Sequence, residues 1–171
     1  FGQGPVGLSG TLAAKSMGAS VIAVDVVSER LALARELGAD HVIHSGESDP
    51  VAAIQDLTGG MGASAVLETS GNPSARSQAL QSLRPFGRCC YVGVGGPASI
   101  DFNQDVIFKV ATIYGSWTFS KSELIEIARF MVEAQVPLKA LITHRYTLDQ
   151  AVEAFRTFDG ATTGKCVFVM D

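Results

Sequence analysis

The sequence has little of several features that would assign a chain to a special class of protein. It contains three cysteines, Cys89, Cys90 and Cys166, of which two are adjacent. An odd number of cysteines, two of them adjacent, does not resemble a disulfide framework, so a reducing compartment is expected. No apolar run approaches the roughly 20 residues that a membrane-spanning helix needs, and no signal-peptide pattern opens the chain. We therefore expect a cytoplasmic protein without a membrane partner.

The sequence also lacks an excess of positive charge. Its 13 Lys and Arg residues against 17 Asp and Glu residues give a net charge of −4 and a pI near 5.3. A nucleic-acid partner is not expected, because nucleic-acid binders usually carry a basic face. Charged residues make up 18% and apolar residues 47%, a balance that excludes a disordered chain. A length of 171 residues predicts one domain, with or without an appendage, and a core large enough to need no disulfides.

The first hundred residues alternate between strand-like and helix-like patterns. Short β-branched or apolar runs predict strands over 20–26, 41–44, 63–69 and 88–94. Helical patterns bounded by proline or glycine lie between them, over 28–37, 50–58 and 73–83. This rhythm predicts an α/β fold of the Rossmann type, in which a doubly wound parallel sheet is covered by helices on both faces.

The pattern changes after Gly95-Gly96-Pro97. Short strands are expected at Ile100–Phe102 and Thr112–Tyr114, followed by a helix over 121–134 that Ser120 caps. A segment over 141–146, a helix over 149–158 and a strand over 165–170 complete the chain. We expect a dinucleotide-binding domain over residues 1–118 and a C-terminal segment over 119–171.

A glycine-rich loop opens the chain as Phe1-Gly2-Gln3-Gly4-Pro5-Val6-Gly7. Gly2, Gly4 and Gly7 form the pattern G-x-G-x-x-G, in which the first glycine permits a tight turn after a strand. The second lets backbone approach a pyrophosphate, and the third lets the next helix pack against the sheet. Because that helix offers unpaired N–H groups and the positive end of its dipole, the loop is a candidate phosphate site.

Asp25 stands near the end of the predicted strand over 20–26, 23 residues after Gly2. A carboxylate about 20 residues beyond the glycine loop is placed to accept hydrogen bonds from the adenosine ribose. It would also repel a 2′-phosphate, so NAD is favoured over NADP. Arg30, five residues further, leaves this preference open. Its plane is able to cover adenine, to meet a 2′-phosphate, or to lie exposed on a helix.

These residues and several longer stretches resemble the zinc-type medium-chain dehydrogenases, which include alcohol, sorbitol and threonine dehydrogenases. The resemblance covers essentially the whole chain and is greatest to the polyol and secondary-alcohol branch. The stretches that carry it are G-Q-G-P-V-G-L, A-K-S-M-G-A, V-I-A-V-D, E-R-L-A-L-A-R-E-L-G-A-D, L-E-T-S-G-N, Y-V-G-V-G, G-S-W, L-I-T-H-R-Y-T-L-D-Q-A-V-E-A-F and T-G-K.

The resemblance implies further cofactor contacts. Thr69 and Ser70 would border a ribose of NAD, the backbone of 92–94 would face the nicotinamide, and Lys165 would meet the pyrophosphate. The complete expected cofactor site is Gly2, Gly4, Pro5, Val6, Gly7, Asp25, Arg30, Thr69, Ser70, Val92, Gly93, Val94 and Lys165. The resemblance also implies a homo-oligomer that pairs through an edge strand around 98–116.

The resemblance places the catalytic zinc on Cys, His and Glu residues of an N-terminal domain, which we expect before Phe1 together with most of the first strand. The segment 119–171 would pack on that catalytic domain. The chain itself shows no zinc-site spacing, since His41 and His44 point to opposite faces of a strand. We therefore expect no metal ligand and no catalytic residue here, and cofactor binding without turnover by this chain alone.

The expected function is that of the NAD-binding portion of a zinc-dependent oxidoreductase, which transfers a hydride between an alcohol or polyol and NAD. Two alternatives stay open. One is a zinc-free, NADPH-dependent quinone-type reductase of the same fold group, against which Asp25 argues. The other is a non-catalytic nucleotide-binding module.

Overall fold

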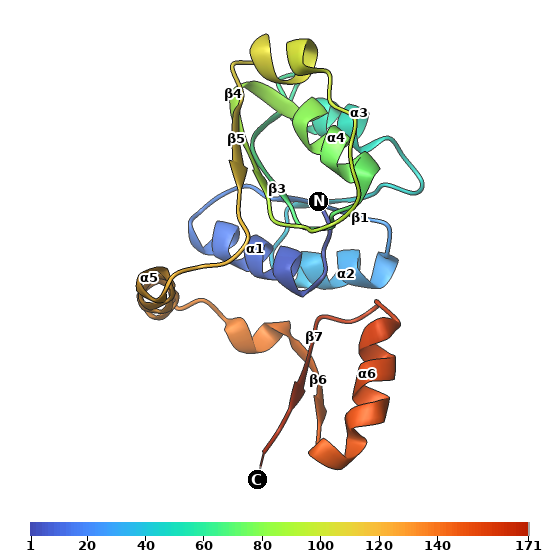
Figure 1. The fold of residues 1–171 in the computed structure, drawn as a ribbon, viewed down its shortest axis with the longest axis vertical. Coiled ribbons are helices and arrows are strands. Elements are labelled where there is room, and N and C mark those ends of the chain that lie inside the picture. The colour runs from blue at the N-terminus through green and yellow to red at the C-terminus, as the bar shows by residue number, and fades with distance from the viewer. Residues whose placement is uncertain (171) are drawn as a thin grey trace.

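The computed structural model describes residues 1–170 as an α/β fold in which every strand pair is parallel (Figure 1). The α-helices are α1 (Pro5–Ser16), α2 (Ser28–Glu36), α3 (Pro50–Leu57), α4 (Pro73–Gln81), α5 (Lys121–Glu133) and α6 (Ala151–Asp159). The strands are β1 (Ile22–Asp25), β2 (His41–His44), β3 (Ala63–Glu68), β4 (Leu83–Tyr91), β5 (Thr112–Gly115), β6 (Ile142–Tyr146) and β7 (Lys165–Phe168).

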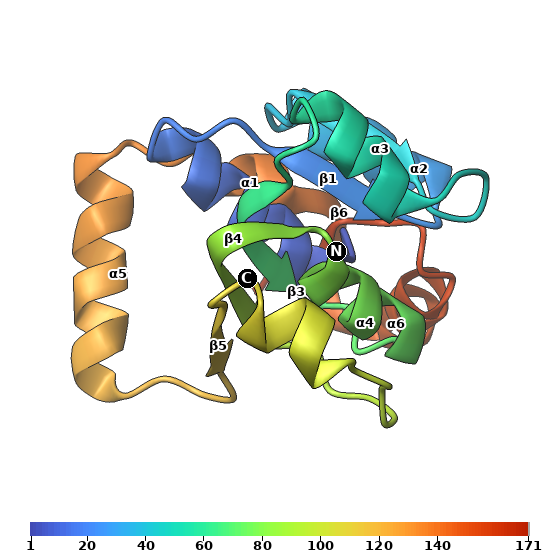
Figure 2. The same ribbon diagram turned by 90° about the horizontal axis from the view of Figure 1, so that it is seen from above.

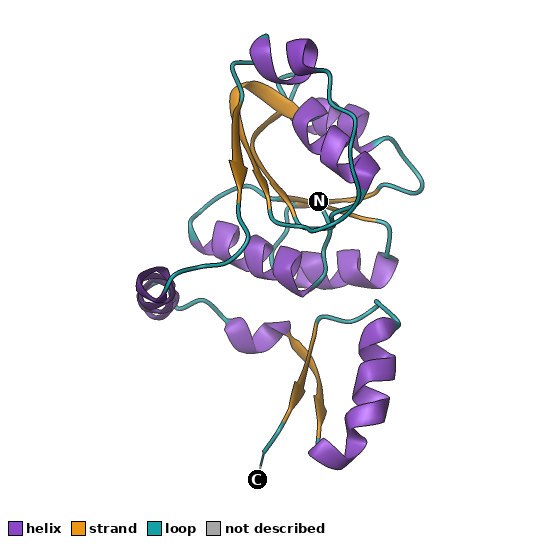
Figure 3. Ribbon diagram, in the orientation of Figure 1, coloured by secondary structure: helices purple, strands orange, loops and turns teal. Residues whose placement is uncertain are grey.

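Two sets of strands form the main sheet. β1 pairs with β2, and β4 lies between β3 and β5. Helices α1 and α2 lie along one side of these strands, and α3 and α4 lie on the other (Figures 1 and 3). The prediction of a doubly wound parallel fold is therefore confirmed, and the connections have the alternation that a covered parallel sheet requires.

Among residues 1–170, Phe1 and Gly2 bridge β1 and β3 at the carboxyl end of the sheet. The Phe1 nitrogen donates to the Leu67 carbonyl at 2.8 Å, and the Gly2 N–H donates to the Val24 carbonyl at 2.8 Å. The rest of this position is a groove of about 650 Å³, whose walls include Ile22 of β1 and residues 63–67 of β3. Phe1 and Gly2 thus occupy the end of a central strand position.

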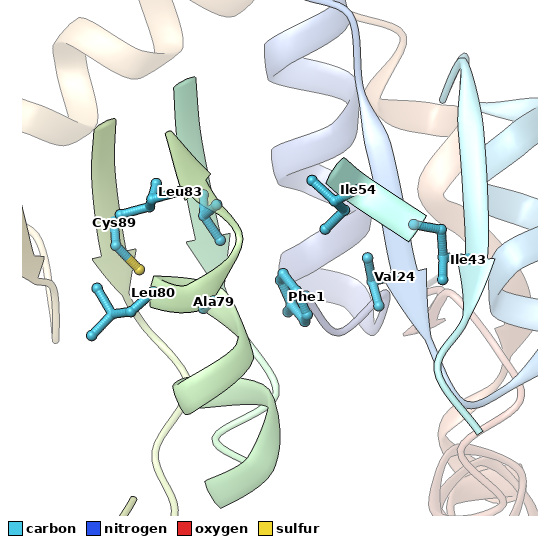
Figure 4. Packing of buried hydrophobic residues seen from close by; sticks show 9 residues of the cluster. Phe1, Val24, Ile43, Ile54, Ala79, Leu80, Leu83 and Cys89 are labelled. Carbon is cyan, nitrogen blue, oxygen red and sulfur yellow. The ribbon is translucent and has the colours of Figure 1, made fainter. Parts of the chain in front are cut away.

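Two apolar clusters hold the sheet to its helices. On one face Phe1 lies between Val24 and Ile43 on one side and Leu80 on the other (Figure 4). This cluster consists of Phe1, Val24, Ile43, Ile54, Val66, Ala79, Leu80, Leu83 and Cys89. The opposite face is packed by Leu8, Leu12, Ala23, Ala34, Leu37, Ala39 and Leu141. Leu141 comes from the C-terminal segment, so that segment shares the core beneath α1.

Local signals start the helices of the second face. Pro50 and Pro73 each occupy the first helical position, where a missing N–H costs nothing. Asp49 accepts from the Val51 N–H at 3.0 Å, and the Asn72 side chain accepts from the Ser74 N–H at 2.9 Å. These caps satisfy N–H groups that a helix start otherwise leaves unpaired, which explains why the sequence located both helices correctly.

The strand expected at Ile100–Phe102 is wrong. Residues Phe102–Ile107 form a single π-helical turn instead, and Ile100 lies in the loop before it. The Asp101 side chain accepts from the Asn103 and Gln104 N–H groups at 3.0 and 3.1 Å. Because this cap captures the N–H groups that a strand would pair, it turns the chain into a helical loop.

The C-terminal segment forms a smaller unit. Ser120 and Glu123 make a reciprocal capping box at the start of α5, and β6 pairs with β7 beside α6. Helix α5 lies apart from the other elements (Figure 2) and contains no buried residue. Within residues 1–170, none of the helices has the length and apolarity that crossing a bilayer requires.

We predict that an apolar strand fused before Phe1 stabilises the fold. Five alternating valine and isoleucine residues would reach into the groove between β1 and β3. They should raise the free energy of unfolding by about 2 kcal/mol, because side-chain burial exceeds the ordering cost. Urea unfolding followed by circular dichroism measures this change. A glycine-serine extension of equal length is the control, and an equal gain from both extensions would contradict the prediction.

Candidate functional site

Most of the expected site residues meet where parallel strands end. The glycine loop follows Phe1, residues 69–71 follow β3, and residues 92–95 follow β4. Asp25 is the last residue of β1. In open parallel sheets, ligands bind beyond the carboxyl ends of the strands, at the position where the chain reverses its direction of winding.

The three glycines of the opening loop have different surroundings. Gly2 has a φ of +84°, and a Cβ on it would lie 2.8 Å from the Ser70 nitrogen. A Cβ on Gly7 would lie 1.8 Å from the Gly2 carbonyl oxygen. A Cβ on Gly4 would meet only the Arg30 guanidinium carbon, at 4.0 Å. Gly2 and Gly7 are therefore required for packing, while Gly4 leaves open space beside the backbone.

That open space lies at the N-terminus of α1. Gly4 is the N-cap, Pro5 is the first helical residue, and Val6 is 55% exposed. The Leu8 N–H bonds the Gly4 carbonyl at 2.9 Å, so the N–H groups of Val6 and Gly7 precede the first bond of the helix. These donors and the helix dipole suit a phosphate, and a Cβ on Gly4 would meet no atom closer than the Arg30 guanidinium carbon.

Asp25 is 6% exposed and joins the glycine loop to the start of α2. Its carboxylate accepts from the Gln3 N–H, and from the N–H groups of Val26 and Val27 at 2.7 and 2.9 Å. A carboxylate offers about four acceptor positions. Three donors therefore satisfy the buried charge and leave capacity for one more hydroxyl.

Arg30 reaches the glycine loop from the first turn of α2. Its guanidinium carbon lies 4.0 Å from the Cβ position of Gly4, and its Nε is buried without a hydrogen-bond partner among residues 1–170. A buried donor normally has a partner. The orphaned Nε therefore fits a site in which a ligand supplies the acceptor.

The loops after β3 and β4 are packed against the glycine loop and against each other. The Thr69 hydroxyl donates to the Gly2 carbonyl at 2.7 Å. A Cβ on Gly71 would lie 2.2 Å from the Val94 carbonyl oxygen, and one on Gly93 would lie 2.2 Å from the Gly71 nitrogen. The expected residues Thr69, Ser70, Val92, Gly93 and Val94 thus form one continuous edge with the glycine loop.

Sequence reasoning missed two charged residues at this edge. Glu68, the last residue of β3, is fully buried and accepts from the N–H groups of Ser70 and Gly71 at 2.8 and 3.0 Å. Arg76 of α4 donates to the Gly93 carbonyl at 2.7 Å. A lone acid within an otherwise uncharged strand was the available signal for Glu68. Nothing local marks Arg76, whose partner lies 17 residues away.

Lys165 is placed elsewhere. It begins β7, pairs in register with Ile142 and is exposed. Together with Phe155 and Phe158 it lines a shallow hollow of about 220 Å³ in the C-terminal unit. Within residues 1–170, no three His, Cys, Asp or Glu side chains are grouped as metal ligands would be, and the three cysteines are free thiols.

Comparison with known proteins places these features in a family. The family model described as "Zinc-binding dehydrogenase" matches residues 5–133. An L-threonine 3-dehydrogenase of Pyrococcus furiosus is 39% identical over 176 residues, which cover 99% of this chain and 50% of that protein. The chain therefore spans about half the length of the curated relatives it matches.

Solved structures agree with this comparison. Benzyl alcohol dehydrogenase from Acinetobacter calcoaceticus superimposes with a TM-score of 0.88 at 37% identity, covering 99% of this chain and 48% of that one. The 2R,3R-butanediol dehydrogenase from Bacillus subtilis gives a TM-score of 0.87 at 29% identity, covering 100% of this chain and 50% of that one. Both superpositions cover nearly the whole chain, including its C-terminal segment.

We predict opposite tolerances at two glycines of the loop. Gly7→Ala should lower the free energy of unfolding by about 3 kcal/mol, because its Cβ would overlap the Gly2 carbonyl oxygen. Gly4→Ala should cost less than about 1 kcal/mol, since it alters only an N-cap beside open space. Chemical denaturation of both variants checks this, and equal losses would contradict the described loop.

Proposed function

The chain belongs to the family of zinc-binding dehydrogenases, and from this premise we propose that it is the NAD-binding part of an alcohol or polyol dehydrogenase. Family membership implies a nicotinamide cofactor and a zinc ion. The observation that carries the proposal is the open backbone at Gly4, which lies at a helix N-terminus beside the buried Asp25. The whole protein would transfer a hydride between its substrate and NAD.

Different residues at the strand ends would hold different parts of NAD. The N–H groups of Val6 and Gly7 would bind the pyrophosphate, with Gly4 and Pro5 providing the close backbone approach. Thr69 and Ser70 would border a ribose, and the backbone of 92–94 would face the nicotinamide. Lys165 would reach the pyrophosphate only from the C-terminal unit, and it is the weakest member of the proposed set.

Asp25 supports a preference for NAD over NADP. Its one remaining acceptor position suits a ribose hydroxyl, whereas a 2′-phosphate would place further negative charge against a buried carboxylate. Arg30 supports the competing NADPH-dependent function, because its orphaned Nε–H would donate to an oxygen of the 2′-phosphate. The relative affinity for the two cofactors separates these candidates.

The described residues do not fit a zinc site, since no donor set is assembled among residues 1–170. We therefore assign the zinc ligands and most of the substrate pocket to the remainder of a longer protein. The relatives named for threonine, benzyl alcohol and butanediol oxidise different compounds that share a hydroxyl group. An alcohol or polyol is accordingly the substrate class proposed here.

Two surfaces of this chain would be covered in the whole protein. The apolar side chains of α5, among them Leu124, Ile125 and Ile127, are exposed and would pack on the catalytic domain. In the part of the chain that the structure describes, strand β5 pairs only with β4, and Ile113 and Tyr114 on it are 40% and 51% exposed. We propose this edge as the contact between two copies of the chain.

We predict that Gly4→Val abolishes most cofactor binding. The valine side chain would occupy the space through which a pyrophosphate approaches, so the affinity for NADH should fall about thirtyfold or more.

NADH should also bind the unaltered chain at least about tenfold more tightly than NADPH. Isothermal titration calorimetry of both cofactors measures these differences.

Gly160→Val, at the end of α6, is the matched control and should keep the original affinity. Equal binding of NADH by Gly4→Val and the unaltered chain would refute the proposed site. Tighter binding of NADPH than NADH would favour the reductase function instead.

We also predict that the 171-residue chain binds NADH without oxidising alcohols, because its described residues assemble no zinc ligands. Purified chain mixed with NAD, zinc and a panel of primary and secondary alcohols should produce no NADH by absorbance. Oxidation that disappears in the Gly4→Val variant would contradict this prediction, since it would come from this chain rather than from a contaminant.

A further inference from the structure

An acidic and a basic side chain meet behind the loops that follow β3 and β4. Glu68 ends β3 with no exposed surface, and Arg76 lies in the first half of α4 with 21% of its side chain exposed. The Arg76 Nε lies 3.9 Å from the Glu68 Oε2, and neither atom has a hydrogen-bond partner among residues 1–170. The two charges therefore face each other in a weakly solvated position, where their attraction is stronger than at a surface.

Glu68 fixes the first of the two loops. Its Oε1 accepts from the Ser70 N–H, the Ser70 hydroxyl and the Gly71 N–H. Three donors on one oxygen hold the chain in a tight turn immediately after β3. This arrangement satisfies Oε1 without Arg76, so the turn has its own support, while Oε2 faces the Arg76 guanidinium.

Arg76 fixes the second loop. Its Nη2 donates to the Gly93 carbonyl at 2.7 Å, and its Nη1 donates to the Gly96 carbonyl at 2.5 Å. Three of the four residues from Gly93 to Gly96 are glycines, which lose more conformational freedom on ordering than any other residue. A planar guanidinium that binds the carbonyls at both ends of this stretch restricts its backbone conformation. The glycines have no side chains that would do the same.

Arg76 is itself held in place. The Tyr91 hydroxyl donates to the Arg76 carbonyl at 2.8 Å. Burial raises the pKa of Tyr91 well above its ordinary value, which keeps the hydroxyl protonated as a donor. Because Tyr91 ends β4 just before the loop, it ties α4 to the strand from which the loop departs. The guanidinium thus reaches the loop from a fixed origin.

We propose that Arg76 is a positioning residue, which holds the Gly93–Gly96 backbone in the shape that receives the nicotinamide. This inference rests on the proposed function, in which residues 92–94 face that ring. Arg76 makes its loop contacts with the second loop and not with the Gly2–Gly7 turn. Its effect is accordingly confined to the nicotinamide end of the site and leaves the adenosine and pyrophosphate end unchanged.

The test compares two ligands that differ only at the nicotinamide end. NADH carries the ring, while ADP-ribose has the same adenosine and pyrophosphate without it. Isothermal titration calorimetry with Arg76→Leu should show NADH binding weakened about tenfold, because a mobile loop must be ordered on binding. ADP-ribose affinity should stay within about twofold of the original value. The fluorescence of bound NADH, which reports the surroundings of the ring, should move toward that of free NADH.

Two further variants control this result. Arg76→Lys keeps the charge and some hydrogen-bonding capacity, so it should recover part of the lost NADH affinity. Arg35→Leu removes an exposed arginine of α2 and should change neither affinity. Thermal unfolding of each variant identifies any loss of the fold, and if Arg76→Leu fails to fold, Arg76→Lys decides the question.

Each outcome has a clear meaning. Unchanged NADH binding in the Arg76 variants that fold, or equal losses of NADH and ADP-ribose, would overturn the positioning role while leaving the proposed function intact. Failure of the unaltered chain to bind either ligand would overturn the proposed function and this inference with it. A selective loss of NADH that lysine partly restores would support it.

Discussion

Contact between backbone and backbone at the carboxyl edge of the sheet is the constraint on which the site depends. The turn at Gly2, the turn at Gly71 and the loop at Gly93 lie so close together that a single Cβ atom would overlap a neighbouring main-chain atom. Such contacts place N–H and C=O groups at the surface instead of side chains. The edge therefore presents main-chain donors at fixed positions, which is what recognition of a phosphate group requires.

Two buried carboxylates make these close contacts possible. Asp25 and Glu68 each end a strand, and each accepts three hydrogen bonds, all but one of them from backbone N–H groups of the turns at this edge. A buried charge without such donors would cost several kcal/mol, so the turns and the acids require each other. Asp25 keeps capacity for one more donor. Glu68 instead faces Arg76, whose guanidinium binds carbonyl groups of the loop after β4.

The surfaces that this chain leaves uncovered are consistent with its family. The groove between β1 and β3 lies at the centre of the sheet, where a parallel strand normally has neighbours on both sides. Helix α5 exposes an apolar face, and β5 exposes an edge. Under the proposed function further protein covers each of these surfaces, and the chain spans about half the length of the matched relatives.

The sequence by itself determined the order of strands and helices outside the Ile100–Ile107 region, the glycine loop, and the placement of Asp25 beside it. The helix starts depend on neighbours within a few residues, such as Pro50 and Pro73, and the position of Asp25 follows from its spacing after the glycine loop. Tertiary structure alone decided the pairing of Glu68 with Arg76, since the two come from different elements and meet through packing. It also placed Lys165 in a separate sheet, where strand pairing rather than local pattern sets its position. Local preference specifies an element, but only the packing of distant elements decides which of their side chains meet.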